Sequence, residues 1–213
     1  MANIRTFGGW AAFYMAATYA AMIVLFLGVL DYLNIVDPAQ KLDLLVERQG
    51  LLTVTNLAAY VVFAMALIVF VLVLRDRLAP GDPFARIGTA TGLVWAGLVM
   101  ASGLVANAGL DRVVALASAD REAAMAYWAS VETISDALGG AAGEFAGGTT
   151  ALLLGWASIR AGFARWAGWL GVVVGLIGLA STWPALYDLG GLFGIAQIVW
   201  FAWTGMALLR SVS

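Results

Sequence analysis

The sequence contains no histidine, no cysteine and a single lysine, Lys41, and only 11% of its 213 residues are charged. Haem, zinc, copper and iron–sulfur sites depend mainly on His or Cys ligands, and thiolate or imidazole catalysis needs the same side chains. These classes are effectively excluded, and no cofactor or metal is expected. A retinal Schiff base requires a lysine within a spanning helix, whereas Lys41 lies in a predicted loop. No Ser or Thr has an evident base, so no enzymatic activity is expected.

The residues that are present are mostly apolar, at 63% of the chain. A soluble domain has roughly 45–50% apolar and about 25% charged residues, so this chain lacks the polar surface that water requires. The sequence therefore predicts an integral membrane protein. No linker, low-complexity segment or repeat divides it, so residues 1–213 are expected to form a single transmembrane domain.

Uncharged apolar runs predict six spanning helices, each long enough to cross ~30 Å of hydrocarbon at 1.5 Å per residue. The expected spans are residues 10–30, 51–74, 87–110, 137–159, 166–186 and 189–209. The fourth is unusual because its charge-free stretch covers only residues 145–159, so a full crossing has to include Glu144. The first run is longer than a signal-peptide core and has no clear cleavage site, so it is expected to begin a polytopic protein.

Basic and acidic residues separate when they are assigned to alternate sides of these spans. One side receives seven basic residues and two acids, namely Arg5, Arg75, Arg77, Arg86, Arg160, Arg165 and Arg210 with Asp76 and Asp82. The other side receives four basic residues and the other eleven acids. Because basic residues favour the cytoplasmic side, both termini are expected in the cytoplasm.

The first acidic loop predicts a short amphipathic helix at the outer membrane surface. Asp37 is a suitable N-cap, Pro38 suits the first helical position, and Gly50 is expected to end the helix. One face of this helix then carries Leu42, Leu45, Val46 and Gln49.

A second amphipathic helix is predicted in the loop between residues 111 and 138. Ser118 is the expected cap, with Asp120 in the first turn. Apolar residues recur at helical spacing, at Ala124, Trp128, Val131 and Leu138. We expect this helix to run nearly continuously into the fourth span.

Glu144 is the sharpest candidate for a functional residue. An ionisable group within a membrane is costly and tends to face a cavity, a partner or a proton path. Glu144 precedes Arg160 by 16 residues, which places it ~24 Å from the inner end of its helix, in the outer third of the bilayer. The alternative is that Glu144 extends to the outer headgroups or bonds a neighbouring helix.

Other polar residues reach the same layer by helical rise, at Asn56, Asn107 and Gln197. Glu132 and Asp136 are expected to line the approach, and Trp183 and Asp188, with Tyr187, to form a wall. Together they predict an outward-facing polar pocket for a ligand. The alternative is that each amide and carboxylate only joins helices, at ~0.6 kcal/mol per side chain.

Small residues predict close helix packing in the bundle, with dimerisation as the alternative. They recur every four residues at Gly139, Gly143 and Gly147 and again at Gly171 and Gly175. The deeper tryptophans are expected to fill the core, at Trp95, Trp156, Trp200 and Trp203.

The segment 155–171, GWASIRAGFARWAGWLG, resembles a recurrent feature of the DUF4386 family of bacterial membrane proteins. In that family a helix ends at a basic residue, turns through Arg-Trp and begins again with a Gly- and Leu-rich span. The family often has proline where this sequence has Ala164. The resemblance implies a six- or seven-helix fold and a bacterial cytoplasmic (inner) membrane, but no activity.

The expected architecture is an all-α, six-span bundle with two outer-surface amphipathic helices. The expected function is non-catalytic binding of a small or lipid-like ligand in the outer pocket, as a sensor or transporter-like element. One alternative is an accessory subunit packed against a larger membrane complex. The other is a lipid-active enzyme with Glu132 and Glu144 as acid and base. Membrane lipids are expected partners, and no nucleic acid is expected.

Overall fold

The computed structural model describes residues 2–210, leaving the side chains of residues 2–5 and 33 outside the description, Arg5 among them. Within residues 2–210 the chain is helical and has no strand, which confirms the all-α class. Its first half contains α1 (Ala2–Ile23), the π-helical η1 (Val24–Val29), η2 (Tyr32–Asn34), α2 (Pro38–Glu47), α3 (Gln49–Asn56), the π-helical η3 (Leu57–Val62) and α4 (Phe63–Arg75). Its second half contains α5 (Pro83–Ala117), α6 (Arg121–Asp136), the π-helical η4 (Ala137–Ala141), α7 (Ala142–Arg160), α8 (Arg165–Ser181), η5 (Pro184–Leu186) and α9 (Leu189–Arg210).

Among the described residues, four helices are long and apolar enough to cross a membrane, namely Thr6–Val29, Gln49–Arg75, Pro83–Ala117 and Leu189–Arg210. The continuous column α6–η4–α7 is less apolar where Glu144 and several glycines interrupt it. Helix α8 is apolar but has 17 residues and ends at Ser181, five residues before the expected end of the fifth span. Pro184 explains this end, because it forces Trp183 into an extended conformation and begins η5.

Aspartates cap the helices that begin outside these apolar stretches. The side chain of Asp37 accepts from the Ala39 N–H, and Pro38 occupies the first helical position, as expected. The prediction for Ser118 was wrong, since Asp120 caps α6 by accepting from the Ala123 N–H. Ser118 instead donates to the carbonyl oxygen of Ala115 at the end of α5.

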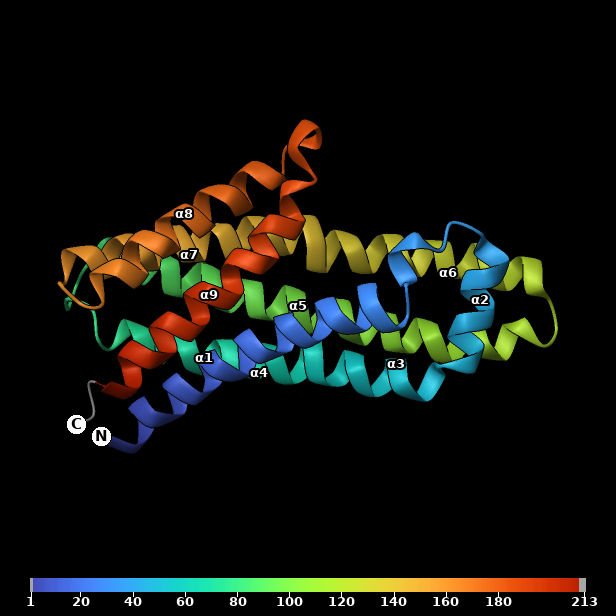
Figure 1. Ribbon diagram of the computed structural model, residues 1–213, viewed down its shortest axis with the longest axis horizontal. Helices are drawn as coiled ribbons and strands as arrows, with labels where there is room; N and C mark the ends of the chain where they lie inside the picture. Colours follow the sequence, from blue (N-terminus) through green and yellow to red (C-terminus); the bar gives the residue numbers. More distant parts are fainter. Residues whose placement is uncertain (1, 211–213) are drawn as a thin grey trace.

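Gly50 does not end the first loop helix. The break lies two residues earlier, at Arg48, whose φ of −106° and ψ of 15° leave the helical region. Gly50 lies inside α3, which continues through η3 into α4. Figure 1 shows α2 crossing the far end of the bundle while α3 turns back along it. The expected continuity between the second loop helix and the fourth span is confirmed, because α6, η4 and α7 follow one another without a break.

The apolar side chains form two cores. The larger lies among α1, α4, α5, α7, α8 and α9 and includes Trp95 and Trp200. The smaller joins α2 and α6 to the extended end of α5. Leu42 and Leu45 on α2 are 1% exposed in this second core, whereas Val46 is 42% exposed and lies off that face. The apolar face of α2 therefore packs on protein.

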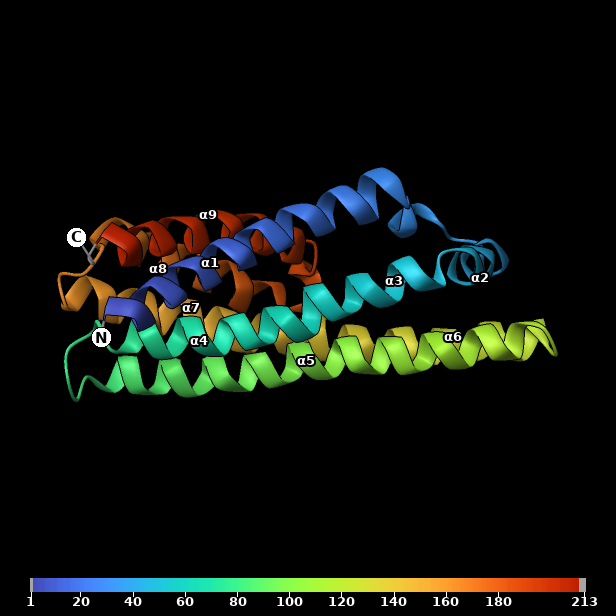
Figure 2. The same ribbon diagram turned by 90° about the horizontal axis from the view of Figure 1, so that it is seen from below.

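Helix lengths explain why there are two cores. At 1.5 Å per residue, α5 is ~50 Å long and the α6–η4–α7 column ~60 Å, compared with ~25 Å for α8 and ~33 Å for α9. Figure 2 shows α8 and α9 ending midway along the long axis while α5 and α6 continue beyond them. The second core lies in this extension.

Helices α7 and α8 pack so closely that glycine backbones touch. A Cβ on Gly155 would lie 2.6 Å from the carbonyl oxygen of Gly168, and one on Gly175 would lie 2.5 Å from the backbone nitrogen of Leu152. Gly171 and Gly175 therefore serve the close packing that the sequence predicts. Gly147 faces another way, because a Cβ there would lie 2.8 Å from the Trp95 ring of α5.

The arginine-bearing helix ends and loops gather at one end of the bundle, which we term the arginine end. There the Arg160 Nε donates to the Asp82 Oδ2 at 3.1 Å, and the guanidinium of Arg77 lies 5.2 Å from the centre of the Phe163 ring. Figure 1 shows that α1 begins and α9 finishes at this end. The opposite end, which carries α2 and α6, is termed the acidic end.

Substituting Gly155→Ala should lower the stability of the protein by about 1–3 kcal/mol, because the new methyl group meets backbone atoms that cannot move aside. Gly97→Ala is the matched control, since a Cβ on Gly97 of α5 has nothing within 4 Å. Melting temperatures of the two variants in detergent compare them directly. Equal melting temperatures would contradict the close α7–α8 contact.

The interactions of Asp82 predict that the stability of the folded protein depends on pH. Burial by itself raises the pKa of this carboxyl, but the Ala85 N–H, Arg160 and the Phe84 N–H together lower it below the ordinary 3.8. Ionised Asp82 therefore stabilises the fold fully above about pH 4, and this contribution is lost as the pH falls through the lowered pKa. Asp82→Asn keeps a capping oxygen but removes the charge, and should cost about 1 kcal/mol at pH 7.

The measurement is the melting temperature between pH 7 and pH 3. The Asp82→Asn variant should melt lower at pH 7 and lose less stability on acidification than the unsubstituted protein. Asp76→Asn, in the same loop and exposed, is the control. Parallel acid profiles for all three proteins would show that Asp82 does not contribute in this way.

Candidate functional site

Two adjoining cavities lie where α9 begins alongside the longer helices. Cavity A has a volume of about 310 Å³ and is lined from α1, η3, α4, α5, α6, η4, α7 and α9. Cavity B has a volume of about 390 Å³ and is lined mainly from α1, η1, α3, α5 and α6. Four residues line both cavities, namely Met22, Tyr60, Ser135 and Asp136. The two volumes therefore form one site with a shared boundary.

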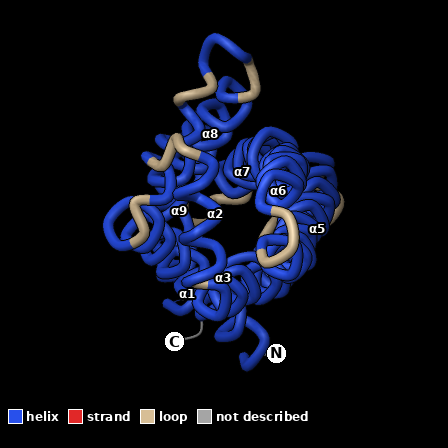
Figure 3. Tube along the Cα trace, turned by 90° about the vertical axis from the view of Figure 1, so that its right-hand side faces the viewer, coloured by secondary structure: helices blue, strands red, loops and turns tan. Residues whose placement is uncertain are grey.

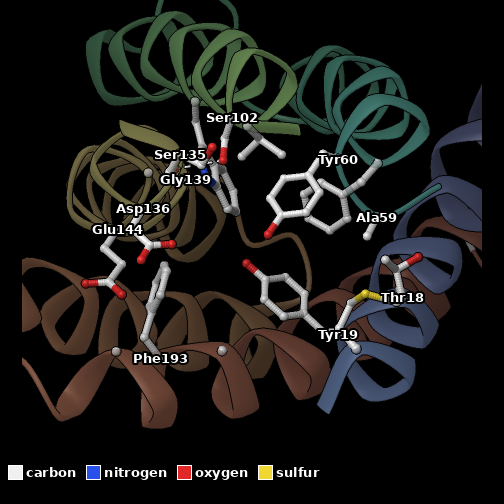
Figure 4. Close-up of a pocket in the computed structure, with 18 residues that line it drawn as sticks. Thr18, Tyr19, Ala59, Tyr60, Ser102, Ser135, Asp136, Gly139, Glu144 and Phe193 are labelled. Atoms are coloured by element: carbon white, nitrogen blue, oxygen red, sulfur yellow. Dashed lines mark hydrogen bonds between the residues drawn. The ribbon is translucent and has the colours of Figure 1, made fainter. Parts of the chain in front are cut away.

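Cavity A combines aromatic walls with polar groups. Figure 4 shows the hydroxyls of Tyr19 and Tyr60 pointing toward one another, with the carboxylates of Asp136 and Glu144 on the wall formed by α6 and α7. Phe193 closes the side that α9 contributes. The cavity thus presents two carboxylates and two phenols to a space that is otherwise apolar.

The helices around the site contain the three π-helical segments of the described chain. Ala59 and Tyr60 of η3 and Gly139 and Gly140 of η4 line cavity A, while residues 26 and 27 of η1 line cavity B. A π-turn inserts an extra residue into a helix and often occurs at functional sites. In the turn before η4, the Ser135 carbonyl oxygen accepts from the Ser102 hydroxyl at 2.8 Å. The wall of the site is thereby held by α5.

Glu144 lines cavity A and also joins two helices. Its Oε2 accepts from the Ser181 hydroxyl at the end of α8, at 2.8 Å. Its Oε1 lies where a Cβ on Gly190 would stand, in the first turn of α9. The backbone N–H groups of a helix's first turn favour a nearby negative charge. Glu144 therefore joins α7 to α8, lies against the first turn of α9 and borders the cavity.

Glu132 is held in a hydrogen-bond network at the acidic end. Its Oε1 accepts from the Tyr32 hydroxyl at 2.8 Å and from the Lys41 Nζ at 2.9 Å. The Trp128 indole N–H donates to the same Tyr32 oxygen at 3.1 Å. Burial and then the bond to Glu132 raise the pKa of Tyr32 far above its usual value, so this phenol stays protonated. Lys41 lies in α2, the helix predicted in the first loop, and neutralises Glu132.

Asp136 lies one turn beyond Glu132 and has no such partner. Within residues 2–210 its carboxylate makes no hydrogen bond or ion pair, although it borders both cavities. Burial raises the pKa of Asp136, and the negative charge of Glu132 raises it further, while Lys41 acts in the opposite direction. Among the carboxylates of the site, Asp136 is the one without a hydrogen-bond or ion-pair partner in the described residues.

The structure brings together only part of the predicted polar layer. The Asn56 amide donates to the Asn107 side-chain oxygen at 2.9 Å, and Asn107 donates to the Thr53 carbonyl oxygen at 3.2 Å. Asn56 borders cavity B, so this pair lies at the edge of the site. Gln197 is fully buried, borders neither cavity, and has no partner within the described part of the chain for either amide atom.

The remaining predicted residues lie apart. Trp183 is 67% exposed and Asp188 is also exposed, and neither lines cavity A or cavity B. Glu132 borders cavity B and Glu144 borders cavity A, so the acid–base pair considered for an enzyme does not share one cavity.

Several residues of the site carry no signal in the sequence. Tyr19, Tyr60 and Phe193 are ordinary aromatics of spanning helices, and Trp95, predicted to fill the core, is buried there but also borders cavity A. Ser135 lies next to Asp136, and its contact with both cavities follows from the helical column. The aromatics at matched depth on α1 and η3 are the only pattern that points to this group.

Comparisons with family models, with curated proteins and with solved structures found no match to this chain. The resemblance to the DUF4386 family stays a prediction. At the position where that family often has proline, Ala164 has a φ of 47°, in the left-handed region. Proline cannot adopt this conformation, because its ring fixes φ near −65°. The turn between α7 and α8 therefore differs locally from that pattern.

Proposed function

We propose that this protein is a six-span integral membrane protein that binds a small or lipid-like ligand, without catalysis, in an outward-facing pocket made of cavities A and B. A sensor or a transporter-like element fits this description. The observation that carries the proposal is the pair of adjoining cavities. They are bordered by Glu144 and by the carboxylate of Asp136, which has no partner among the described residues. Packed cores rarely leave spaces larger than a water molecule.

The six-span topology adds α7 and α8 to the four helices of sufficient length and hydropathy. Both lie in the larger core, and the turn between them returns the chain at the arginine end. A 17-residue helix rises ~25 Å, close to the thickness of the hydrocarbon. In this arrangement α2 and α6 form a cap that extends beyond the outer surface, with the cavities just below it.

The proposed orientation has the arginine end in the cytoplasm of a bacterial cell and the acidic end outside. The support is the separation of charge: arginines gather where α4, α7 and α9 end, and most acids lie toward α2 and α6. Basic residues near the ends of spans favour the cytoplasmic side. The pocket then opens toward the outer leaflet or the space beyond it.

An accessory subunit of a larger membrane complex is the second candidate. The bond between Glu144 and Ser181 favours it, because it gives the carboxylate a structural role. The outer face of α8 also carries large exposed apolar side chains, at Trp166, Trp169, Val173 and Leu176. Purification in a mild detergent separates the candidates, since a partner subunit and a bound small molecule differ in mass.

Filling the pocket should remove its ligand. A Cβ on Gly140 has only the Tyr187 hydroxyl within 4 Å, at 3.9 Å, so Gly140→Leu adds a side chain at the cavity wall without a backbone clash. In native mass spectrometry of protein purified from its native membrane, we expect one small-molecule adduct that is lost, or reduced at least five-fold, in Gly140→Leu.

Gly97→Leu is the matched control, since it adds the same side chain to α5 at an exposed position that borders neither cavity. It should retain the adduct. Equal retention by both variants would remove the cavities as the binding site, and Glu144→Gln with unchanged retention would remove the role of that carboxylate.

The orientation can be read from single cysteines, because the chain has none of its own. Ala119 lies exposed in the turn before α6, and Ala79 lies exposed in the turn before α5. An impermeant thiol reagent should label Ala119→Cys in intact cells and Ala79→Cys only after permeabilisation. The reverse result would overturn the orientation.

A further inference from the structure

The charges around the site do not balance. Among the acids that border the cavities, Glu132 is paired with Lys41 at 2.9 Å, whereas no ion pair within residues 2–210 engages Asp136 or Glu144. No Lys or Arg among the described residues borders cavity A or cavity B. Asp136 is exposed and Glu144 is half-buried. Carboxylates attract a positive charge, and do so more strongly beside apolar walls that exclude water. The site therefore presents negative charge with no cation supplied by the described residues.

A second observation, independent of the acids, marks the same place. Ser135 is 9% exposed, and its hydroxyl oxygen has no hydrogen-bond partner within the described part of the chain. The residue borders both cavities, next to Asp136. Buried hydroxyls in proteins are nearly always hydrogen-bonded, because an unpaired one destabilises the fold. A rotation about χ1 of Ser135 would bring this oxygen to a ligand at the boundary.

The walls of cavity A suit an organic cation. Tyr19 and Phe63 meet edge to face with ring centres 5.4 Å apart, and Phe63 meets Trp95 at 6.3 Å. These rings line the cavity together with Tyr60 and Phe193. Aromatic faces attract an ammonium group, most strongly where water is excluded. An anionic ligand would gain nothing from these walls and would meet two carboxylates.

Cavity B continues the site with a mainly apolar lining. Phe26, Leu27, Leu52 and Leu110 border it, beyond the shared residues Ser135 and Asp136. Each methylene group that a ligand buries in such a space stabilises the complex. A ligand that places its charged group in cavity A can extend an apolar chain into cavity B.

We propose that the site binds an amphiphilic amine, with its ammonium group beside Asp136 among the aromatic walls of cavity A and its apolar chain in cavity B. Glu144 adds negative potential from the same wall of the cavity, and the Ser135 hydroxyl, once rotated about χ1, accepts a hydrogen bond where the amine carries an N–H. This inference rests on the proposed function and names the chemical class of its ligand.

The test uses three probes with the same eight-carbon chain: octyltrimethylammonium, octanoate and octanol. The purified full-length protein in nanodiscs of zwitterionic lipid is titrated with each probe, and bound probe is counted by native mass spectrometry. We expect octyltrimethylammonium to bind with an apparent affinity at least ten-fold higher than either other probe. Octanoate or octanol binding as tightly as the ammonium probe would overturn the proposal.

Asp136→Asn should weaken binding of the ammonium probe at least ten-fold and leave octanol binding within two-fold. The matched control is Asp188→Asn, which removes an exposed acid just before α9 that borders neither cavity. Equal affinity in these two variants would exclude Asp136 as the counter-charge. If Asp136→Asn does not fold, the ranking of the three probes on the unsubstituted protein decides the proposal by itself.

Failure of this inference can be told from failure of the proposed function. If Gly140→Leu removes the adduct found in native membranes but the three probes bind equally, the pocket is retained as the binding site and the cationic ligand class is rejected. If Gly140→Leu and Gly97→Leu bind every probe equally well, both the pocket and the ligand class are rejected.

Discussion

The difference in length between neighbouring helices governs this structure. Helices α8 and α9 are ~25 and ~33 Å long, whereas α5 and the α6–η4–α7 column are ~50 and ~60 Å long. Where α9 begins, the longer helices lose a neighbour, and Gly190, Phe193 and Gly194 of its first turns border the resulting space. Helices α1 and α3 border the remaining sides of this space. The cavities lie at this step, and the second core with α2 and α6 lies beyond it.

A few charged side chains hold specific elements of this architecture together. At the arginine end, Asp82 caps α5 and holds Arg160. At the acidic end, Lys41 holds Glu132 and thereby fixes α2 against α6. Among the acids that border the cavities, Glu132 and Glu144 have hydrogen-bond partners in the described residues, whereas Asp136 has none. Buried side-chain atoms without a partner in the same part of the chain are the Ser135 hydroxyl, the Gln197 amide, the Arg77 Nε and the Thr204 hydroxyl.

The parts of the site that follow from position along a single helix could be predicted. Helical rise places Asn56 and Asn107 at one depth, and they do bond. The same measure puts Gln197 in that layer, but its rotation about the axis of α9 carries it into the core, away from both cavities. Depth follows from counting residues in a helix. Which face meets a cavity depends on how neighbouring helices pack, and apolar spans carry almost no periodicity from which to read it.

Composition and periodicity by themselves indicate apolar helices of membrane-spanning length, the helical class, the capping by Asp37 and the separation of basic from acidic helix ends, because each depends on local chemistry. The tertiary structure decided that α2 packs on protein, that Glu144 joins Ser181, and that Asp136 and not Glu144 is left without a partner. The 63% apolar composition accommodates many arrangements of the same helices. The choice among them follows from glycine contacts between α7 and α8 and from the unequal helix lengths, which act only once the helices are packed.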